Sequence, residues 1–172
     1  MSSSIKNLST IEVSEVAQLK NVKIGIVTSE WNHEITFALL DGCTATLKKY
    51  GCSDNDILSI QVPGAFELPS GAKLLLSNNK LDAVICLGCV IKGETKHDEY
   101  ICNAVSVGIM SLSVASGKPV IFGLLTPNDM QQAIDRSGGK YGNKGVEAAL
   151  TAIKMIHLSN EVKNMEKNKI GF

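Results

Sequence analysis

The strongest chemical signal in the sequence is the loop that runs from a short apolar segment into a long helical pattern, at residues 88–97. Its glycine spacing is that of a nucleotide phosphate loop, but Glu94 stands where such a loop needs a lysine. A carboxylate there repels the outer phosphates of a nucleoside triphosphate, which argues against this ligand class. What remains is a predicted helix N-terminus with free N–H groups at Glu94 and Thr95, able to hold one small phosphate.

His97 lies just inside the helix predicted after this loop. The positive end of a helix dipole favours the neutral imidazole, which can act as a base near pH 7. The alternative is an ordinary surface histidine. The chain has three histidines, His33, His97 and His157, and only His97 follows the predicted anion site. We therefore favour a role for His97 in proton transfer.

A second cationic segment occurs at residues 135–145, which are rich in glycine and carry Arg136, Lys140 and Lys144. One interpretation is a flexible, solvated loop between two helices. The other is a wall of positive charge for a phosphate, with Arg136 as a bidentate clamp.

Two further loops offer groups that could bind a flat, hydroxylated ligand. Trp31 is the only tryptophan and follows the first predicted strand, where it serves either packing or stacking on a planar heterocycle. Glu67 follows Pro63 and Gly64 at a predicted helix start, where its carboxylate either stabilises the helix dipole or accepts hydrogen bonds from sugar hydroxyls. The small Ala65 permits close approach of a ligand.

The five cysteines predict neither a disulfide framework nor a metal site. Cys86 and Cys89 form a C-x-x-C pair, but they lie in a segment that reads as a strand. Residues three apart on a strand point to opposite faces, so we favour inert, buried thiols over a redox or metal pair. No zinc spacing, calcium loop or Ser-His-Asp order is present.

The elements that must position these groups alternate between strands and helices. Strands are predicted at 22–28, 57–62, 83–91 and 120–125, and helices at 32–50, 67–76, 95–116, 127–134 and 143–157. We expect Asn32 to cap the first helix, Gly51 to end it, and Pro69 to lie in the first turn of the second. This pattern predicts an α/β fold with a parallel sheet covered on both faces, and ligands at the carboxyl ends of its strands.

Length and composition predict one domain, at residues 22–159, between an N-terminal arm at 1–21 and a C-terminal tail at 160–172 that frays. Lys plus Arg and Asp plus Glu are 17 each, so nothing indicates a nucleic-acid surface, and the zero net charge favours an oligomer. No apolar run reaches the roughly 18 residues that span a bilayer. The N-terminus lacks the apolar core of a signal peptide, so we expect a cytoplasmic protein without membrane contact.

Taken together, five segments resemble the lumazine synthase family in order and spacing, over about residues 20–157. They are Ile24-Gly25-Ile26-Val27 leading to Trp31-Asn32, Val62-Pro63-Gly64-Ala65-Phe66-Glu67, Leu87-Gly88-x-Val90-Ile91-x-Gly93-x-Thr95-x-His97, Pro119-Val120-Ile121-Phe122-Gly123 and Gly142-Asn143-Lys144-Gly145. Such coverage is far more specific than any single motif. The resemblance implies a flavodoxin-like, three-layer α/β/α sandwich with a four-stranded parallel sheet, and a homo-pentamer with active sites shared between neighbours.

The resemblance also implies a set of site residues and no cofactor. The implied catalytic residues are His97, Arg136 and Lys144. The implied substrate contacts are Trp31, Asn32, Ala65, Phe66, Glu67, Gly88, Val90, Ile91, Glu94, Thr95, Phe122, Arg136 and Lys144. In this scheme Trp31 stacks on the pyrimidine, Glu67 binds ribityl hydroxyls and the backbone near Val90 reads the uracil edge.

The remaining implied roles concern phosphate and the subunit boundary. The amides of Glu94 and Thr95 hold the phosphate together with Arg136 of the adjacent subunit, and His97 moves protons. Phe122 and Lys144 of that neighbour close the pocket over the ring. The short loop from Arg136 to Lys144 is like that of members that form an icosahedral shell of pentamers, for which riboflavin synthase is a candidate partner. The N-terminal arm is expected to add a strand to a neighbour's sheet.

The implied reaction joins 5-amino-6-(D-ribitylamino)uracil to 3,4-dihydroxy-2-butanone 4-phosphate, giving 6,7-dimethyl-8-ribityllumazine, phosphate and water. Glu30 departs from the family pattern, since many members carry a basic residue before the aromatic one. Fold alone leaves open a non-catalytic flavin- or ligand-binding module, or a shell protein without activity.

Overall fold

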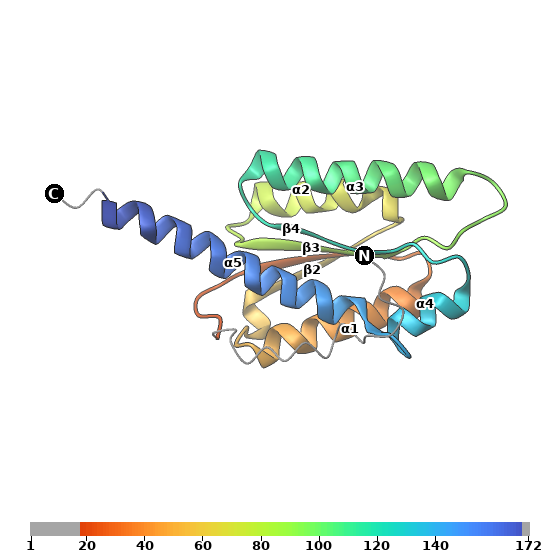
Figure 1. Cartoon of the computed structure of the whole chain (residues 1–172), viewed down its shortest axis with the longest axis horizontal. Helices are drawn as coiled ribbons and strands as arrows, with labels where there is room; N and C mark the ends of the chain where they lie inside the picture. The colour runs from red at the N-terminus through yellow and green to blue at the C-terminus, as the bar shows by residue number, and fades with distance from the viewer. Residues whose placement is uncertain (1–17, 170–172) are drawn as a thin grey trace.

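The computed structural model describes residues 18–169, with side chains described through Met165. Its centre is a four-stranded sheet in the order β2-β1-β3-β4, made by β1 (Ile24–Ser29), β2 (Ile57–Val62), β3 (Ala83–Cys89) and β4 (Val120–Leu125) (Figure 1). All three strand pairings are parallel. The predicted parallel sheet is therefore confirmed.

Helices cover both faces of this sheet. α2 (Leu68–Asn78) and α3 (His97–Ser116) lie on one face, and α1 (His33–Lys49), α4 (Met130–Arg136) and α5 (Lys144–Lys169) lie on the other (Figure 1). Two short 3-10 helices, at Asp54–Asp56 and Ala65–Glu67, precede β2 and α2. The structure confirms the predicted three-layer α/β/α sandwich.

Alternate residues of the central strands enter two separate cores, because successive side chains of a strand point to opposite faces. Ile26 and Ile85 pack in the core beneath α1 and α5, whereas Val27 and Val84 pack in the core beneath α2 and α3. Each such fully buried side chain contributes about 1.5–3 kcal/mol to folding. β1 and β3 are buried along their whole length, which fixes the strand ends that carry the functional loops.

The two cysteines of the C-x-x-C pair lie in different cores. Cys89 belongs to the core on the α1 side and Cys86 to the core on the α2 side, so the prediction that they point to opposite faces is confirmed. Burial raises the pKa of each thiol to about 12, with nearby Cys102 adding to the effect at Cys89. Thiols that stay protonated are poor nucleophiles and poor metal ligands.

Two helix starts differ from the sequence prediction. α3 begins at His97, so Glu94 and Thr95 lie in the loop before the helix instead of in its first turn. α4 begins at Met130 instead of Pro127, because Asp129 caps it by accepting a hydrogen bond from the Gln132 N–H at 2.8 Å. Each difference moves the helix start by two or three residues.

The segment predicted as a loop after α4 contains a small hairpin, formed by β5 (Ser137–Gly139) and β6 (Gly142–Asn143). Gly138 and Gly142 have φ angles of 131° and 83°, a backbone region that glycine adopts without steric cost. The segment is therefore a hairpin instead of a loop without secondary structure, with an exposed tip at residues 138–140. The hairpin leads directly from α4 to the start of α5.

The chain ends also differ from the prediction. α5 continues to Lys169, so the predicted helix end near His157 is wrong. The predicted fraying of the tail at residues 160–172 stays a prediction. No glycine or proline occurs between Val146 and Lys169, so nothing in the sequence stops the helix. No helix within residues 18–169 is long and apolar enough to cross a membrane.

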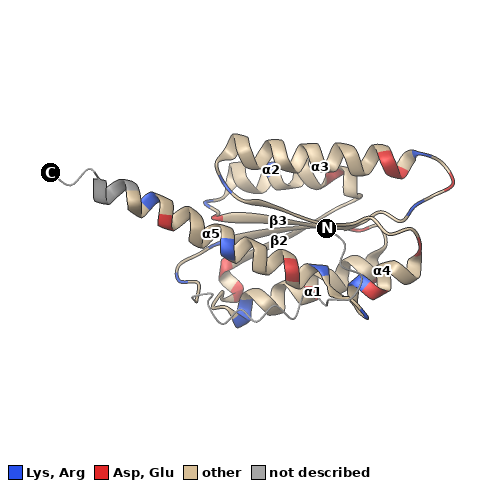
Figure 2. Ribbon diagram, in the orientation of Figure 1, with Lys and Arg blue, Asp and Glu red and all other residues tan. Residues whose placement is uncertain are grey.

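Most of the predicted N-terminal arm, including its proposed strand addition, lies outside the described residues. Within residues 18–21, Leu19 is buried and its N–H donates to the Tyr50 carbonyl oxygen at 2.8 Å. α1, α4 and α5 each carry charges of both signs (Figure 2). This distribution gives those helices no continuous basic stripe of the kind that follows a nucleic-acid backbone.

Candidate active site

A pocket of about 650 Å³ opens where β1, β2 and β3 end, the edge at which parallel sheets bind ligands. We call it the front pocket. It is lined by Trp31, Asn32, Gly64, Ala65, Phe66, Glu67, Cys89, Val90, Ile91, His97, Tyr100 and Ile101. The structure therefore brings together most of the residues that the sequence predicted for the ring, ribityl and proton-transfer roles.

Trp31 lies at the mouth of the front pocket with 74% of its surface exposed. The chain holds it there because the Glu30 N–H donates to the Val62 carbonyl at 2.9 Å, which ties this loop to the end of β2. A tryptophan used for core packing would be buried. Within the subunit the indole ring is thus free to stack on a planar ligand.

Asn32 connects the loop to the end of β3. Its backbone is left-handed, with φ 58° and ψ 44°, and its side-chain amide donates to the Cys89 carbonyl at 2.9 Å. Asn32 therefore occupies the predicted N-cap position of α1, but its side chain makes no cap hydrogen bond. The Asn32 carbonyl instead accepts the N–H groups of Ile35 and Thr36 at 2.9 and 3.0 Å, while its amide joins two strand ends.

Glu67 closes the turn between β2 and α2. Its Oε2 accepts the Gly64 N–H at 3.1 Å, and Pro69 is the second residue of α2, as predicted. The carboxylate also lines the front pocket beside Phe66, which is 58% exposed. Stabilisation of the turn and acceptance of ligand hydroxyls are therefore compatible roles for this one side chain.

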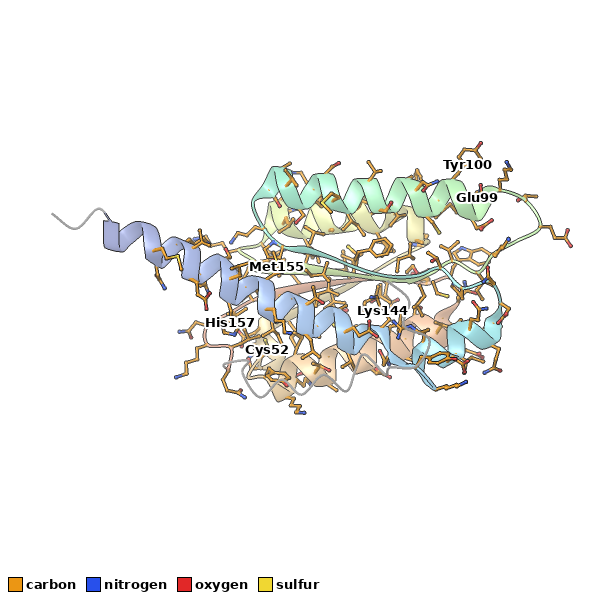
Figure 3. All side chains as sticks on the ribbon, viewed as in Figure 1. Cys52, Glu99, Tyr100, Lys144, Met155 and His157 are labelled. Atoms are coloured by element: carbon orange, nitrogen blue, oxygen red, sulfur yellow. The ribbon has the colours of Figure 1, made fainter. Side chains whose placement is uncertain are left out.

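His97 is the first residue of α3 and is exposed on the pocket wall. Tyr100 lies one turn further along α3 (Figure 3). It also belongs to the lining of the front pocket, and the sequence analysis did not select it. The sequence could have indicated Tyr100 by its position three residues after His97, because residues three apart on a helix are neighbours.

Six predicted substrate contacts do not line the front pocket, and three of them lie in β3 or in the loop before α3. Glu94 and Thr95 are exposed in the loop that leads into α3. Gly88 is enclosed within β3, where an added Cβ would lie 2.8 Å from Leu124 Cδ1 and 2.9 Å from Leu68 Cδ1. The structure therefore explains the need for glycine at position 88 by close packing, and its predicted ligand contact stays a prediction.

The remaining predicted residues meet at a second, smaller pocket of about 320 Å³ beside the end of β4. We call it the back pocket. It is lined by Phe122, Leu124, Leu125, Thr126, Pro127, Gln132, Arg136 and Lys144. Phe122, Arg136 and Lys144 are therefore neighbours in the fold, although they come from β4, α4 and α5.

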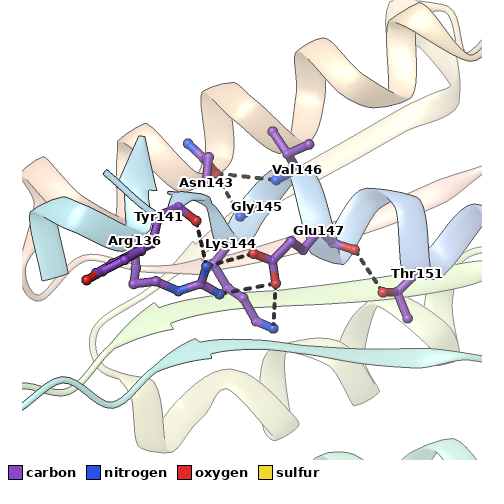
Figure 4. Close-up of polar contacts among 8 residues, drawn as sticks. All are labelled: Arg136, Tyr141, Asn143, Lys144, Gly145, Val146, Glu147 and Thr151. Atoms are coloured by element: carbon purple, nitrogen blue, oxygen red, sulfur yellow. Dashed lines mark hydrogen bonds and ion pairs between the residues drawn. The ribbon is translucent and has the colours of Figure 1, made fainter. Parts of the chain in front are cut away.

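Glu147 holds the two cations of the back pocket (Figure 4). Arg136 Nη2 donates to Glu147 Oε2 at 3.1 Å, Arg136 Nη1 lies 2.9 Å from Oε1, and Lys144 Nζ donates to Oε2 at 3.3 Å. The Glu147 side chain is only 10% exposed, so these interactions are weakly screened by solvent. The sequence analysis missed Glu147, whose signal was its position three residues after Lys144.

Backbone contacts fix the position of this group. Arg136 Nη1 also donates to the Tyr141 carbonyl at 2.8 Å. Asn143 Oδ1 accepts the Gly145 N–H at 2.8 Å and the Val146 N–H at 3.3 Å at the start of α5. The hairpin and this cap therefore set where Arg136 and Lys144 lie.

The two pockets divide the chemistry between them. Among the described residues, none that lines the front pocket is a lysine or arginine, whereas the back pocket has Arg136 and Lys144. The front pocket can hold a planar, hydroxyl-bearing ligand next to a histidine, and the back pocket can hold an anion. In residues 18–169, no group of three or more His, Cys, Asp or Glu side chains is placed to hold a metal ion.

Comparison with known proteins identifies the family of this chain. The model of the 6,7-dimethyl-8-ribityllumazine synthase family matches residues 21–160. The 6,7-dimethyl-8-ribityllumazine synthase of Cytophaga hutchinsonii is 52% identical over 156 residues, which cover 91% of this chain and 98% of that protein. The enzyme of the same name from Bacteroides fragilis is 55% identical over 135 residues, covering 78% of this chain and 94% of that protein. This chain therefore belongs to the 6,7-dimethyl-8-ribityllumazine synthase family.

Proposed function

We propose that this chain condenses 5-amino-6-(D-ribitylamino)uracil with 3,4-dihydroxy-2-butanone 4-phosphate to give 6,7-dimethyl-8-ribityllumazine, the penultimate step of riboflavin biosynthesis. The observation that carries the proposal is the division between a front pocket with Trp31, Glu67 and His97 and a back pocket with Arg136 and Lys144. One substrate is a flat ring with a polyol chain and the other carries a phosphate. The two pockets match these two requirements.

We propose that each active site joins the front pocket of one subunit to the back pocket of its neighbour. Phe122 is 38% exposed on β4 and the rings of Trp31 and Phe66 are more exposed still, so both pockets present aromatic surface that a second subunit would cover. Trp31 and Phe122 would then enclose the pyrimidine from two sides.

In this site the residues of the chain bind, orient and move protons. Glu67 accepts hydrogen bonds from ribityl hydroxyls, and backbone groups at Val90 and Ile91 read the uracil edge. Arg136 of the neighbour binds the phosphate together with the backbone amides of Glu94 and Thr95. These two residues lie in the loop before α3, which moves toward the phosphate when the substrate binds.

The reaction needs no group beyond the substrates and these side chains. The uracil amine attacks the ketone, and loss of water gives an imine. Elimination breaks the C–O bond to phosphate, and the second amine then closes the ring with loss of a second water. His97 accepts and returns protons, while orientation of the two substrates supplies most of the acceleration.

The proposal extends to the assembly. We propose a cytoplasmic homo-pentamer, in which the N-terminal arm reaches a neighbouring subunit. The short connection between Arg136 and Lys144 favours an icosahedral shell of pentamers, and a riboflavin synthase is the candidate internal partner.

The direct test mixes the purified chain with both substrates and follows lumazine absorbance and phosphate release. The expected result is one phosphate released for each lumazine formed, at a rate proportional to enzyme. A flavin- or ligand-binding module would bind the uracil without forming product, and a shell protein without activity would assemble without turnover. Either result would overturn the proposed reaction.

A further inference from the structure

A separate pocket of about 460 Å³ lies where α2 and α3 end, beside the residues that lead into β3 and β4. This is the opposite end of the sheet from the front pocket. Figure 2 shows basic positions in blue on the loops that follow α2 and α3 at this end. We call it the lysine pocket. It is lined by Lys73, Leu76, Ser77, Asn79, Lys80, Leu81, Asp82, Leu112, Ser116 and Lys118.

The charged side chains of the lysine pocket favour an anion that carries two charges. Lys73, Lys80 and Lys118 supply three positive charges and Asp82 supplies one negative charge, so the lining has a net charge of +2. Lys118 Nζ lies 4.0 Å from Asp82 Oδ1. Among the described residues, no ion pair involves Lys73 or Lys80, so their ammonium groups are available to a ligand.

Asp82 is held in place by the backbone at the start of β3. Its Oδ2 accepts the Lys23 N–H at 2.9 Å, and its own N–H donates to the Lys23 carbonyl at 2.8 Å. The carboxylate therefore has a structural role of its own, and Lys118 is its partner on the pocket side. An anion that enters the pocket meets the two other lysines without having to break these backbone contacts.

The end of α2 does not depend on the lysines for its capping. The last carbonyls of a helix favour cations when they have no hydrogen-bond partner. Here the Asn78 side-chain amide donates to the Leu74 carbonyl at 2.9 Å. The Asn79 side-chain amide donates to the Leu75 carbonyl at 3.1 Å. Two of these carbonyls are thus satisfied by asparagines, which leaves the nearby ammonium groups for another use.

The uncharged part of the lining combines leucines with hydroxyl groups. Leu81 is buried, and Leu76 and Leu112 are half-buried against the core beneath α2 and α3. Ser77 and Ser116 are exposed beside them. Small-molecule sites commonly join apolar surface to a few polar groups in a volume of about 300–1,000 Å³. The lysine pocket has this composition and this size.

We propose that the lysine pocket binds a small organic phosphate, that is, a phosphate monoester with an apolar part. A phosphate monoester carries about 1.5 to 2 negative charges at pH 7, which matches the net charge of the lining. Its oxygens accept hydrogen bonds from Lys73 and Lys80, while the leucines contact the apolar part. The site goes beyond the proposed function, because none of its residues lines the front or the back pocket.

The test measures how fast each lysine of the intact chain is acetylated, by peptide mass spectrometry, with and without phenyl phosphate. This probe joins a phosphate monoester to an apolar ring. At about ten times its dissociation constant, it should slow acetylation of Lys73 and Lys80 by about tenfold, because only the unoccupied fraction reacts. Lys154 and Lys163 are exposed on α5 and should react at unchanged rates. Equal rates at Lys73 and Lys80 with and without the probe would overturn the site.

Inorganic phosphate is the matched probe without the ring. It should need about tenfold higher concentration for the same protection, because the contact between the ring and the leucines is missing. Equal protection by both probes would overturn the assignment to an organic phosphate.

A pair of charge-matched variants completes the experiment. Lys73→Gln with Lys80→Gln should weaken protection of Lys118 by phenyl phosphate about tenfold or more, because two charge-assisted hydrogen bonds are lost. Lys154→Gln with Lys163→Gln removes the same charge from α5 and should bind the probe like the parent. Equal protection of Lys118 in the first variant and the parent would count against the proposed contacts.

The residue-by-residue measurement separates this site from the proposed active site. Phenyl phosphate bound in the back pocket would protect Lys144, which does not line the lysine pocket. Acetylation requires neither substrate nor turnover. A failure to form lumazine would therefore leave the protection of Lys73 and Lys80 unchanged.

Discussion

The front pocket presents three aromatic side chains that the single subunit leaves largely open. Trp31, Phe66 and Tyr100 are 74%, 58% and 73% exposed. Large aromatic side chains at this exposure contribute little to the stability of the subunit, so their substitution separates binding from folding. Substitutions here therefore report on ligand and partner contacts.

Trp31→Ala should weaken binding of the ribitylamino-uracil by about tenfold, because the stacking face for the pyrimidine is lost. Isothermal titration of the uracil substrate gives the dissociation constant directly. Trp31→Phe keeps an aromatic ring for stacking and should lower the affinity for the uracil much less. Equal affinity in the parent and in Trp31→Ala would remove Trp31 from the ring site.

Arg136→Ala should raise the KM for the sugar phosphate by about 10- to 100-fold, since a charge-assisted pair to the phosphate is removed. The KM for the uracil should change far less. Lys140→Ala is the control, because Lys140 lies near the Tyr141 ring instead of in the back pocket. An unchanged KM for the sugar phosphate would exclude Arg136 from the phosphate site.

His97→Ala should lower kcat by about 10- to 100-fold with little change in either KM, because one proton-transfer group is lost while orientation remains. His33→Ala is a matched control, since His33 is also an exposed first residue of a helix. Steady-state kinetics at saturating substrates measure the effect. If both variants turned over like the parent, His97 would have no part in the reaction.

The sequence indicated site residues whose role depends on their own side chain, and missed a residue whose role depends on a partner that is distant in the sequence. Trp31 and His97 were found because each is rare in the chain and follows a strand. Glu147 was missed because its importance comes from Arg136, which lies eleven residues away and meets it only after the hairpin folds. Gly88 was selected for its place in a motif, and only the packing of Leu124 and Leu68 shows the local need for glycine.

At the scale of elements, the turn from β1 into α1 depends on one strained residue. Asn32→Ala should lower the free energy of unfolding by about 1–3 kcal/mol, because alanine tolerates the left-handed backbone poorly and the bond to the Cys89 carbonyl is lost. Urea denaturation at one fixed chain concentration measures it. Asn32→Gly allows the left-handed backbone without steric cost, so it should lower the free energy of unfolding by less. Equal losses for both variants would show that the backbone conformation adds nothing.

The strands and helices could be predicted because the periodicity of their apolar residues is local. The residues at which they begin and end were harder to predict. The start of α4 depends on a cap by Asp129 that competes with Pro127 as a start signal. The length of α5 was underestimated because no residue from 157 to 165 is buried, so a core-facing pattern could not reveal this part of the helix. Helices without a covering surface are the elements that periodicity predicts least well.

For the whole molecule, a shared site predicts complementation between subunits. His97→Ala and Arg136→Ala chains, mixed in equal amounts, dissociated and reassembled, should recover about one quarter of parental sites, because each site draws its two pockets independently. Activity is compared before and after reassembly. A mixture that stays at the average of the two variants would show that both pockets of a site come from one chain.

The overall architecture could be predicted because alternating apolar runs and helices allow few arrangements other than a covered parallel sheet. The relation between the two pockets could not be derived from periodicity. It depends on a neighbouring surface, and a single sequence gives no local pattern for contacts between copies. The family resemblance supplied that expectation instead.

The carboxylate between Arg136 and Lys144 has a consequence for how the back pocket meets an anion. From a distance, two positive groups and one negative group act as a single positive charge, so long-range attraction is weak and capture should depend little on ionic strength. At contact, an incoming group must offer several acceptor oxygens to replace those of Glu147. A phosphate meets that condition and chloride does not, so the arrangement discriminates by the number of acceptors as well as by charge.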